Sequence, residues 1–273
     1  MANMQRWKPG AGTARRVAQF ERLLQQAREG LSGGRFASEI SQDKLPQLIC
    51  RHNSLIRRRL GDLDMALQEN KAVNLSLAAR QVTGVFIRPG ETFSFWRLVG
   101  NPSARKGYRA GLTLRTGKPE TWVGGGLCQM TNLIHWMVLH SPLTVVEQHA
   151  HQPADFFPDY GRQIPFGLGT SVFYRDWDYR FLNATDCTFQ LLVWTDEYYL
   201  RGELRADKRL PVRYRITVED DRFIRENGAV YRRGRVYRTC LDGNTGAVLF
   251  RELLRDNHAR VLYDTSNLQI QRE

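Results

Sequence analysis

The stretch that decides the fold reads Trp122-Val123-Gly124-Gly125-Gly126-Leu127-Cys128-Gln129-Met130-Thr131-Asn132. Glycine has no side chain to pack, so Gly124, Gly125 and Gly126 indicate a sharp backbone turn and the close approach of another segment. The apolar pattern over residues 129–140 then predicts a buried helix. We expect a strand, a tight turn, a cysteine and a helix in succession, the local geometry of a nucleophile elbow.

The cysteine at position 128 falls at the first turn of this helix, where unpaired N–H groups and the helix dipole favour negative charge. Such a position tends to lower the pKa of a thiol. The backbone N–H groups of Cys128 and Gln129 could also hold an oxyanion. The side-chain amides of Gln129 and Asn132 are the polar groups near the helix start. The pattern therefore indicates a thiol nucleophile or, alternatively, a structural cysteine, since free cysteine is often buried.

Two histidines, His149 and His151, follow the helix. Residues two apart in an extended chain point to the same side. One imidazole could take the thiol proton while the other orients it or binds substrate. We expect His151 to act as the base, with His149 as the fallback. A metal site at the pair is less favoured, since catalytic sites normally supply three protein ligands, and we expect no cofactor.

The composition is that of a globular protein: 273 residues, of which 42% are hydrophobic and 25% charged. The length allows one large domain or two modest ones. A net charge of +12 favours anionic partners, such as an anionic membrane surface or an envelope polymer. Nucleic acid is disfavoured because no binding module is recognisable. The cysteines have no paired spacing, so we expect reduced thiols and no zinc site: Cys50, Cys128, Cys187 and Cys240.

The first residues lack the apolar region of an export signal, and no run of eighteen apolar residues occurs. The sequence therefore predicts a cytoplasmic protein, or one that is peripheral at the inner face of the membrane. Residues 13–31 have the pattern of a basic amphipathic helix, which fits packing on the core better than binding to a membrane. The run Arg57-Arg58-Arg59 is interpreted as a solvated face, the alternative being a phosphate or carboxylate contact.

Periodicity and turn signals predict an α+β fold. We expect N-terminal helices, a mixed sheet with the buried central helix after the Gly-Gly-Gly-x-Cys turn, and a β-rich C-terminal part. The chain is divided into residues 1–67, a core at 68–195 and a C-terminal region at 196–273. A helix is expected over 70–81, and strands over 85–87, 93–96, 108–114, 120–123, 143–147, 189–194 and 198–204.

Short strands are expected to continue over 212–218, 223–225, 230–231, 236–241, 248–253 and 261–263. The pair Asn227-Gly228 and the run from Asp242 to Gly246 are typical of hairpin turns. Arginines alternate with apolar residues in this region, which predicts the solvent face of an antiparallel sheet: Arg213, Arg215, Arg232, Arg233 and Arg235.

Three blocks resemble the signature of the VanW family, whose members are named from glycopeptide-resistance gene clusters: Pro89-Gly90-Glu91-Thr92-Phe93-Ser94-Phe95, Gly124-Gly125-Gly126-Leu127-Cys128-Gln129 and Val146-Glu147-Gln148-His149-Ala150-His151. The resemblance runs from about Gln68 to Trp194. Some multidomain relatives are described as cysteine-dependent L,D-transpeptidases. The resemblance therefore implies a candidate acyl transferase or amidase, with Cys128 as nucleophile, on cell-wall stem peptides or their precursors. The alternative is a non-catalytic accessory or binding protein of the resistance system that uses the same cleft.

One position departs from the family pattern. Many members carry an aspartate in a Gly-x-Asp-Ala-Thr-Val motif, whereas this chain has Gly169 there. A carboxylate that would orient the histidine is therefore missing at that position. Asp178, which matches the family's acidic position before a strand, and Asp155 are the expected substitutes.

Overall fold

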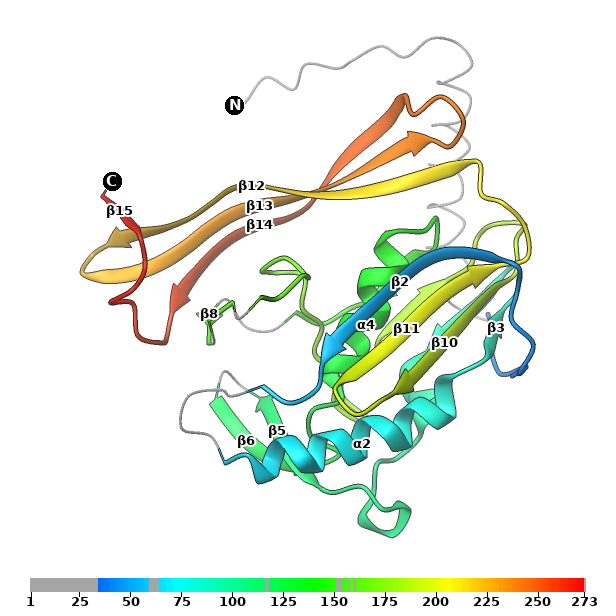
Figure 1. Ribbon diagram of the computed structural model, residues 1–273, viewed down its shortest axis with the longest axis horizontal. Coiled ribbons are helices and arrows are strands. Elements are labelled where there is room, and N and C mark those ends of the chain that lie inside the picture. Colours follow the sequence, from blue (N-terminus) through cyan, green and yellow to red (C-terminus); the bar gives the residue numbers. More distant parts are fainter. Residues whose placement is uncertain are drawn as a thin grey trace.

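The computed structural model describes residues 34–58, 64–115, 118–150, 154–156, 158–159 and 161–272. The helix expected over 13–31, Arg59 and His151 lie outside these residues. Within them the chain has the predicted α+β fold, rich in strands that form several sheets (Figure 1). No helix in the described ranges is both long and apolar enough to cross a membrane.

The helices are α2 (Ala66–Val82), α3 (Phe95–Val99), α4 (Cys128–Leu139) and the 3-10 turn η2 (Ala104–Lys106). The strands are β1 (Arg35–Phe36), β2 (Gln47–Leu55), β3 (Val85–Ile87), β4 (Glu91–Ser94), β5 (Ala110–Arg115), β6 (Lys118–Val123), β7 (Thr144–Glu147), β8 (Ala154–Asp155), β9 (Arg180–Leu182), β10 (Phe189–Thr195), β11 (Tyr199–Ala206), β12 (Val212–Glu226), β13 (Ala229–Asp242), β14 (Val248–Val261) and β15 (Ile270–Arg272).

A sheet of order β2-β11-β10-β3 forms the centre of the molecule and contacts both long helices, α2 and α4. Helix α4 is buried as predicted, and it approaches β11 so closely that a Cβ on Gly202 would lie 2.5 Å from the Leu133 side chain. The sheet contains strands from all three predicted regions of the chain, since β2 precedes residue 68 and β11 follows residue 195.

A second sheet, of order β1-β4-β9-β7, contains the Glu91–Ser94 part of the Pro-Gly-Glu-Thr-Phe-Ser-Phe block. Its core contains the stacked rings of Phe93 and Phe181, with centroids 4.7 Å apart. The expected strand over 93–96 is wrong at its end, because the chain turns into helix α3 at Phe95. The Ser94 hydroxyl accepts a hydrogen bond from the Arg97 N–H at 3.3 Å, which caps the new helix.

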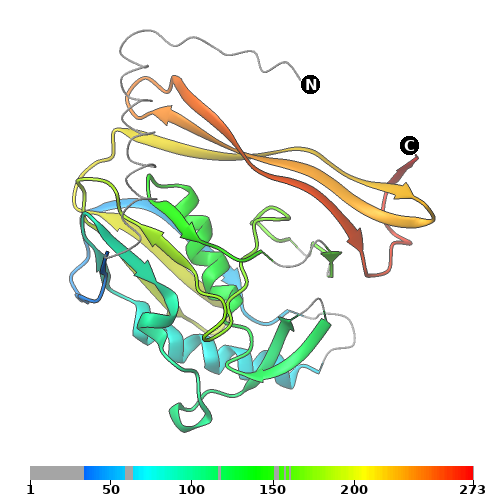
Figure 2. The ribbon, with the colours of Figure 1, turned by 180° about the vertical axis from the view of Figure 1, so that it is seen from behind.

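The C-terminal part is a long twisted ribbon made by β12, β13 and β14 (Figures 1 and 2). The short strands expected here join into three long ones, because backbone pairing continues across the polar residues and across register irregularities at Glu219/Arg222, Val236/Tyr237 and Cys240/Leu241. Both predicted hairpin turns are confirmed, with Asn227 and Gly228 at positive φ of 48° and 79°.

The arginines of this ribbon divide into two groups. Arg213, Arg215 and Arg235 are exposed, as predicted for a solvent face, whereas Arg232 is buried, which corrects the prediction for that residue. The Arg232 guanidinium lies among three carboxylates, at 3.5 Å from Asp155, 2.6 Å from Asp159 and 2.7 Å from Asp221.

Arg238 attaches the same ribbon to the end of α4. Its guanidinium is buried and donates to the Leu139 carbonyl at 2.9 Å, to the Ser141 carbonyl, and to Glu252 at 2.9 Å. Arg232 and Arg238 therefore hold the ribbon over the region that contains the predicted site.

Candidate functional site

The glycine triplet is a close-packing turn. Gly124 and Gly126 have φ of +86° and +92°, a region that side chains rarely adopt. A Cβ on Gly125 would lie 2.0 Å from the Gly111 carbonyl oxygen of β5, and one on Gly126 would lie 2.3 Å from Cγ of Lys71. The segments that approach the turn are thus the β5 backbone and the stem of a lysine on α2.

Cys128 is the first residue of α4, as the sequence predicts. Its sulfur lies 3.9 Å from the Val172 carbonyl oxygen. The expectation of a lowered pKa is wrong for this structure: burial raises the pKa of the Cys128 thiol, and this effect outweighs the opposing backbone hydrogen bonds with Val172 and Cys128 itself. In the free protein the group is a thiol and needs a proton acceptor to become a nucleophile.

The amides around the thiol have defined partners. The Gln129 backbone N–H donates to the Gly126 carbonyl at 3.1 Å, and its side-chain amide donates to Ser54 Oγ at 2.9 Å and to the Leu55 carbonyl at 2.8 Å. Gln129 therefore ties the helix start to the end of β2, and its N–H groups are already used in this structure.

Asn132 lies four residues after Cys128 and hence on the same face of α4. Its Oδ1 accepts from the Thr170 backbone N–H at 2.6 Å and from the Thr170 hydroxyl at 2.9 Å. No acceptor among the described residues bonds to its Nδ2, so this N–H₂ group can donate to a ligand.

The His149 backbone pairs with the segment that contacts the thiol: its carbonyl accepts from the Ser171 N–H at 2.6 Å, and Val172, the next residue, contacts the Cys128 sulfur. Its ring, however, bonds to Glu147 at 3.0 Å and stacks on Trp177 with centroids 5.7 Å apart. The carboxylate that orients this histidine is Glu147, which the sequence analysis did not single out.

Neither predicted acid contacts a histidine within the described residues. Asp178 is buried and accepts hydrogen bonds from the Ser94 hydroxyl at 2.6 Å and from Arg180 at 2.8 Å. Asp155 accepts from the Tyr263 hydroxyl at 3.0 Å, and burial raises the pKa of its carboxyl. Both aspartates hold segments of the fold together around the site.

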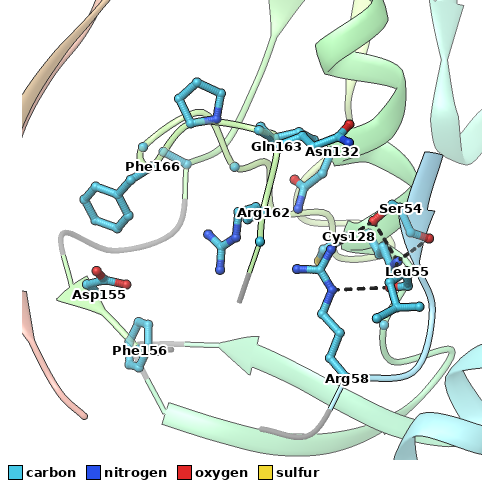
Figure 3. A pocket seen from close by; sticks show the side chains of 18 of the residues that line it. Ser54, Leu55, Arg58, Cys128, Asn132, Asp155, Phe156, Arg162, Gln163 and Phe166 are labelled. Carbon is cyan, nitrogen blue, oxygen red and sulfur yellow. Dashed lines mark hydrogen bonds between the residues drawn. The ribbon is translucent and has the colours of Figure 1, made fainter. Parts of the chain in front are cut away.

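A cavity of about 550 Å³ opens next to Cys128. Its walls come from the end of β2, the start of α4, residues within 154–156 and 161–169, and strand β14 (Figure 3). Cys128, Gly126, Gln129 and Asn132 all line it, as does Gly169. The position where family members often have an aspartate thus faces this cavity, and the glycine leaves it without a carboxylate there.

Two kinds of cation also line this cavity, and Lys71 and Arg162 were not predicted from the sequence; the solvated face predicted for the run 57–59 is wrong for Arg58, which lines the cavity. Lys71 is buried and donates to Gln68 Oε1 at 2.6 Å, and burial, with help from the charges of Arg58 and Arg57, lowers its pKa to about 7. Arg58 and Arg162 also line the cavity. A lysine three residues after a glutamine on a helix of mixed composition gives no sequence signal, because its burial depends on the glycine turn.

The sequence of the chain is similar to those of known proteins. A family model described as "VanW like protein" matches residues 70–205. The vancomycin B-type resistance protein VanW of Enterococcus faecalis is 36% identical over 228 residues, which cover 84% of this chain and 82% of that protein. An uncharacterized protein of Bacillus subtilis, YoaR, is 29% identical over 118 residues, 42% of this chain and 36% of its own length. No solved structure matches the chain.

The match to the family model contains the glycine turn, Cys128 and His149, and the relative from Enterococcus faecalis extends the similarity over most of the chain. The chain is a member of the VanW family.

Proposed function

We propose that this protein is a cysteine-dependent acyl transferase or amidase acting on peptide-like cell-wall precursors in the cavity beside Cys128. The observation that carries the proposal is the position of the thiol. It lies at the start of a buried helix, on the wall of a cavity of about 550 Å³, a size that suits a ligand of a few residues. The relative from Enterococcus faecalis is named as a vancomycin B-type resistance protein, which supports a substrate of the cell wall.

In the proposed reaction the Cys128 sulfur attacks a peptide carbonyl carbon and forms a thioester, while the carbon–nitrogen bond breaks and the amine leaves with a proton. Attack of a second amine, or of water, on the thioester releases the product and restores the thiol. The Asn132 Nδ2 group, which has no acceptor among the described residues, is a donor available to the oxyanion.

The thiol proton needs an acceptor because burial raises the pKa of Cys128. Lys71 is a candidate, since an amine with a pKa of about 7 is partly unprotonated at neutral pH and faces the same cavity. His149 remains the alternative base, which would have to leave Glu147 or act while bound to it. His151, the base expected from the sequence, lies outside the described residues.

Intact-protein mass spectrometry after incubation with synthetic stem peptides tests the proposal. We expect an adduct with the mass of the acyl part of the peptide, sensitive to hydroxylamine and absent from the Cys128→Ala variant. Cys50→Ala is the matched control, because Cys50 is also a half-buried free thiol but belongs to β2. If no acyl-enzyme is trapped and no stem peptide of any length is turned over, the result would count against catalysis.

A non-catalytic binding protein is the second candidate. It is favoured by the raised pKa of the Cys128 thiol and by the ring of His149 being bound to Glu147 rather than to sulfur. In that case stem peptides bind equally well to the wild type and to Cys128→Ala, and no product forms with either protein.

A further inference from the structure

The arginine run at the end of β2 splits into two different environments. Arg57 lies at the surface and forms a two-point ion pair with Glu69, at 2.6 Å and 2.8 Å. Arg58 turns the other way and lines the cavity. Its donors reach the Leu55 carbonyl at 3.3 Å and the Ser54 hydroxyl at 3.5 Å, and no carboxylate within the described residues forms an ion pair with it.

Arg162 approaches the same space from the segment on the other side. Its nearest ion pair is a long one, at 3.6 Å from Asp159 Oδ1, while the other oxygen of Asp159 lies 2.6 Å from Arg232. That carboxylate is therefore shared, and its stronger contact is with the ribbon. In Figure 3 the guanidinium groups of Arg58 and Arg162 both point into the cavity.

The two charges are close enough to disfavour each other. Burial lowers the pKa of Arg58, and the charge of Arg162 lowers it further. Burial likewise lowers the pKa of Lys71, and the charge of Arg58 adds to that effect. Arg58, Arg162 and Lys71 therefore face one cavity, whose lining also includes Arg255 and the carboxylates Asp155 and Asp256. Among the described residues, the contact of Arg162 with Asp159 is the one ion pair that these three cations form. Such an arrangement costs free energy in the empty protein and is relieved when an anion enters.

Arginines with a purely structural role in this protein have more hydrogen-bond and ion-pair partners than Arg58 and Arg162. Arg238 donates to two backbone carbonyls and a carboxylate, and Arg232 lies among three carboxylates. Arg58 and Arg162 have only long contacts, which leave most of their N–H groups free for a ligand. A structural role alone therefore does not explain why both point into the cavity.

We propose that Arg58 and Arg162 bind the free carboxylate of a peptide whose scissile carbonyl lies at Cys128. This inference rests on the proposed function for the location of the carbonyl, but the carboxylate site itself does not require catalysis. A guanidinium group is planar and matches a carboxylate through two parallel hydrogen bonds. The cavity also offers the Asn132 amide for the backbone of the peptide.

Isothermal titration calorimetry tests the site in the Cys128→Ala protein, so that turnover does not disturb binding. The probes are N-acetyl-L-lysyl-D-alanyl-D-alanine and its C-terminal carboxamide, which differ in the charge of one group. We expect the acid to bind roughly tenfold more tightly than the amide, because the amide lacks the charge that strengthens the hydrogen bonds from the two arginines. Arg58→Gln and Arg162→Gln should each remove most of this preference and leave binding of the amide within about twofold.

Arg57→Gln is the matched control, because Arg57 is next to Arg58 in the sequence but forms an ion pair with Glu69 at the surface. It should retain the full preference for the acid. Arg58→Lys, which keeps the charge and loses the two-point geometry, should give an intermediate preference. Near-UV circular dichroism on each variant verifies that the fold is intact before binding is compared.

Equal binding of acid and amide, or a preference that survives both glutamine substitutions, would overturn the carboxylate site. Tighter binding of inorganic pyrophosphate than of the acid, lost in the same two arginine variants, would also overturn it, because the site would then bind phosphate. Absence of detectable binding by either peptide also overturns it. If the preference is found but no acyl-enzyme forms on the wild type, the carboxylate site stands and the proposed catalysis fails.

Discussion

Lys71 lies across Gly126, so that the stem of a buried lysine on α2 fills the space that a side chain at position 126 would need. This contact joins the glycine turn, the cysteine that follows it two residues later and the lysine amine in one packed unit. It also explains why the turn that begins helix α4 needs a glycine at its third position.

The first prediction is that Gly126→Ala destabilises the protein more than a strained φ alone would. The positive φ costs about 1–2 kcal/mol, and overlap with the Lys71 stem adds about 1–3 kcal/mol. Gly228→Ala is the matched control, since Gly228 has φ of +79° and nothing within 4 Å of the added Cβ. Urea unfolding measures both, and equal losses of stability would contradict the packed contact.

The second prediction concerns the pH dependence of stability. The pKa of Lys71 is about 7 in the folded protein and near 10.5 in the unfolded chain. Between these values the unfolded state binds the extra proton, so this residue makes stability rise with pH, by up to about 1.4 kcal/mol per pH unit. Lys71→Met should be more stable than the wild type at pH 7, and the difference should shrink toward pH 10.

Urea unfolding from pH 6 to pH 10 measures that difference. Lys106→Met, at an exposed lysine, serves as the control. A stability difference between Lys71→Met and the wild type that stays constant with pH would mean that the lysine is not buried as a charged group.

The third prediction is that the Cys128 thiol reacts slowly with iodoacetamide at neutral pH. Because burial raises its pKa above the ordinary value of 9.0, the rate should still be increasing with pH beyond pH 9. His149→Ala should leave this profile unchanged, because the His149 ring is bonded to Glu147. A rate that levels off below pH 8, read from mass spectrometry of the alkylated protein, would show a stabilised thiolate instead.

The fourth prediction concerns acid. His135 is buried against the Tyr179 hydroxyl at 3.0 Å, and burial lowers its pKa to about 3. The unfolded chain binds a proton at this residue near pH 6.5, so stability falls as the pH decreases from 6.5 toward 3, by up to about 1.4 kcal/mol per pH unit. His135→Gln should flatten this part of the curve in urea unfolding from pH 7 to pH 4. An unchanged slope would contradict a neutral buried histidine.

The fifth prediction tests how the ribbon is held. Arg238→Lys keeps the charge but loses the fork that reaches Leu139, Ser141 and Glu252, so it should cost about 1–3 kcal/mol, as for buried carbonyls that lose a hydrogen-bond donor. Arg235→Lys, on the exposed face, should cost less than about 1 kcal/mol. Limited proteolysis of the 207–211 connection, followed by mass spectrometry, should become faster only in the first variant.

The α+β fold, the buried helix after the glycine turn, most strands and the hairpin turns could be predicted from the sequence. Each of these depends on residues close together in the chain: the apolar period of 129–140, or Asn227 followed by Gly228. The same holds for the position of Cys128 at the first turn of α4. Family membership also followed from blocks of neighbouring residues.

The environment of the site was decided by tertiary structure alone. The pKa of Cys128 depends on how much water the surrounding segments exclude, and burial of the thiol reverses the effect expected from the helix start, although the backbone hydrogen bond with Val172 opposes it. Lys71 becomes a candidate base because it packs on a turn 55 residues away in the chain. Arg57 and Arg58 are adjacent and chemically identical, yet one pairs at the surface and the other faces the cavity. Sequence fixes which charges are present, but packing decides which of them lose water and partners.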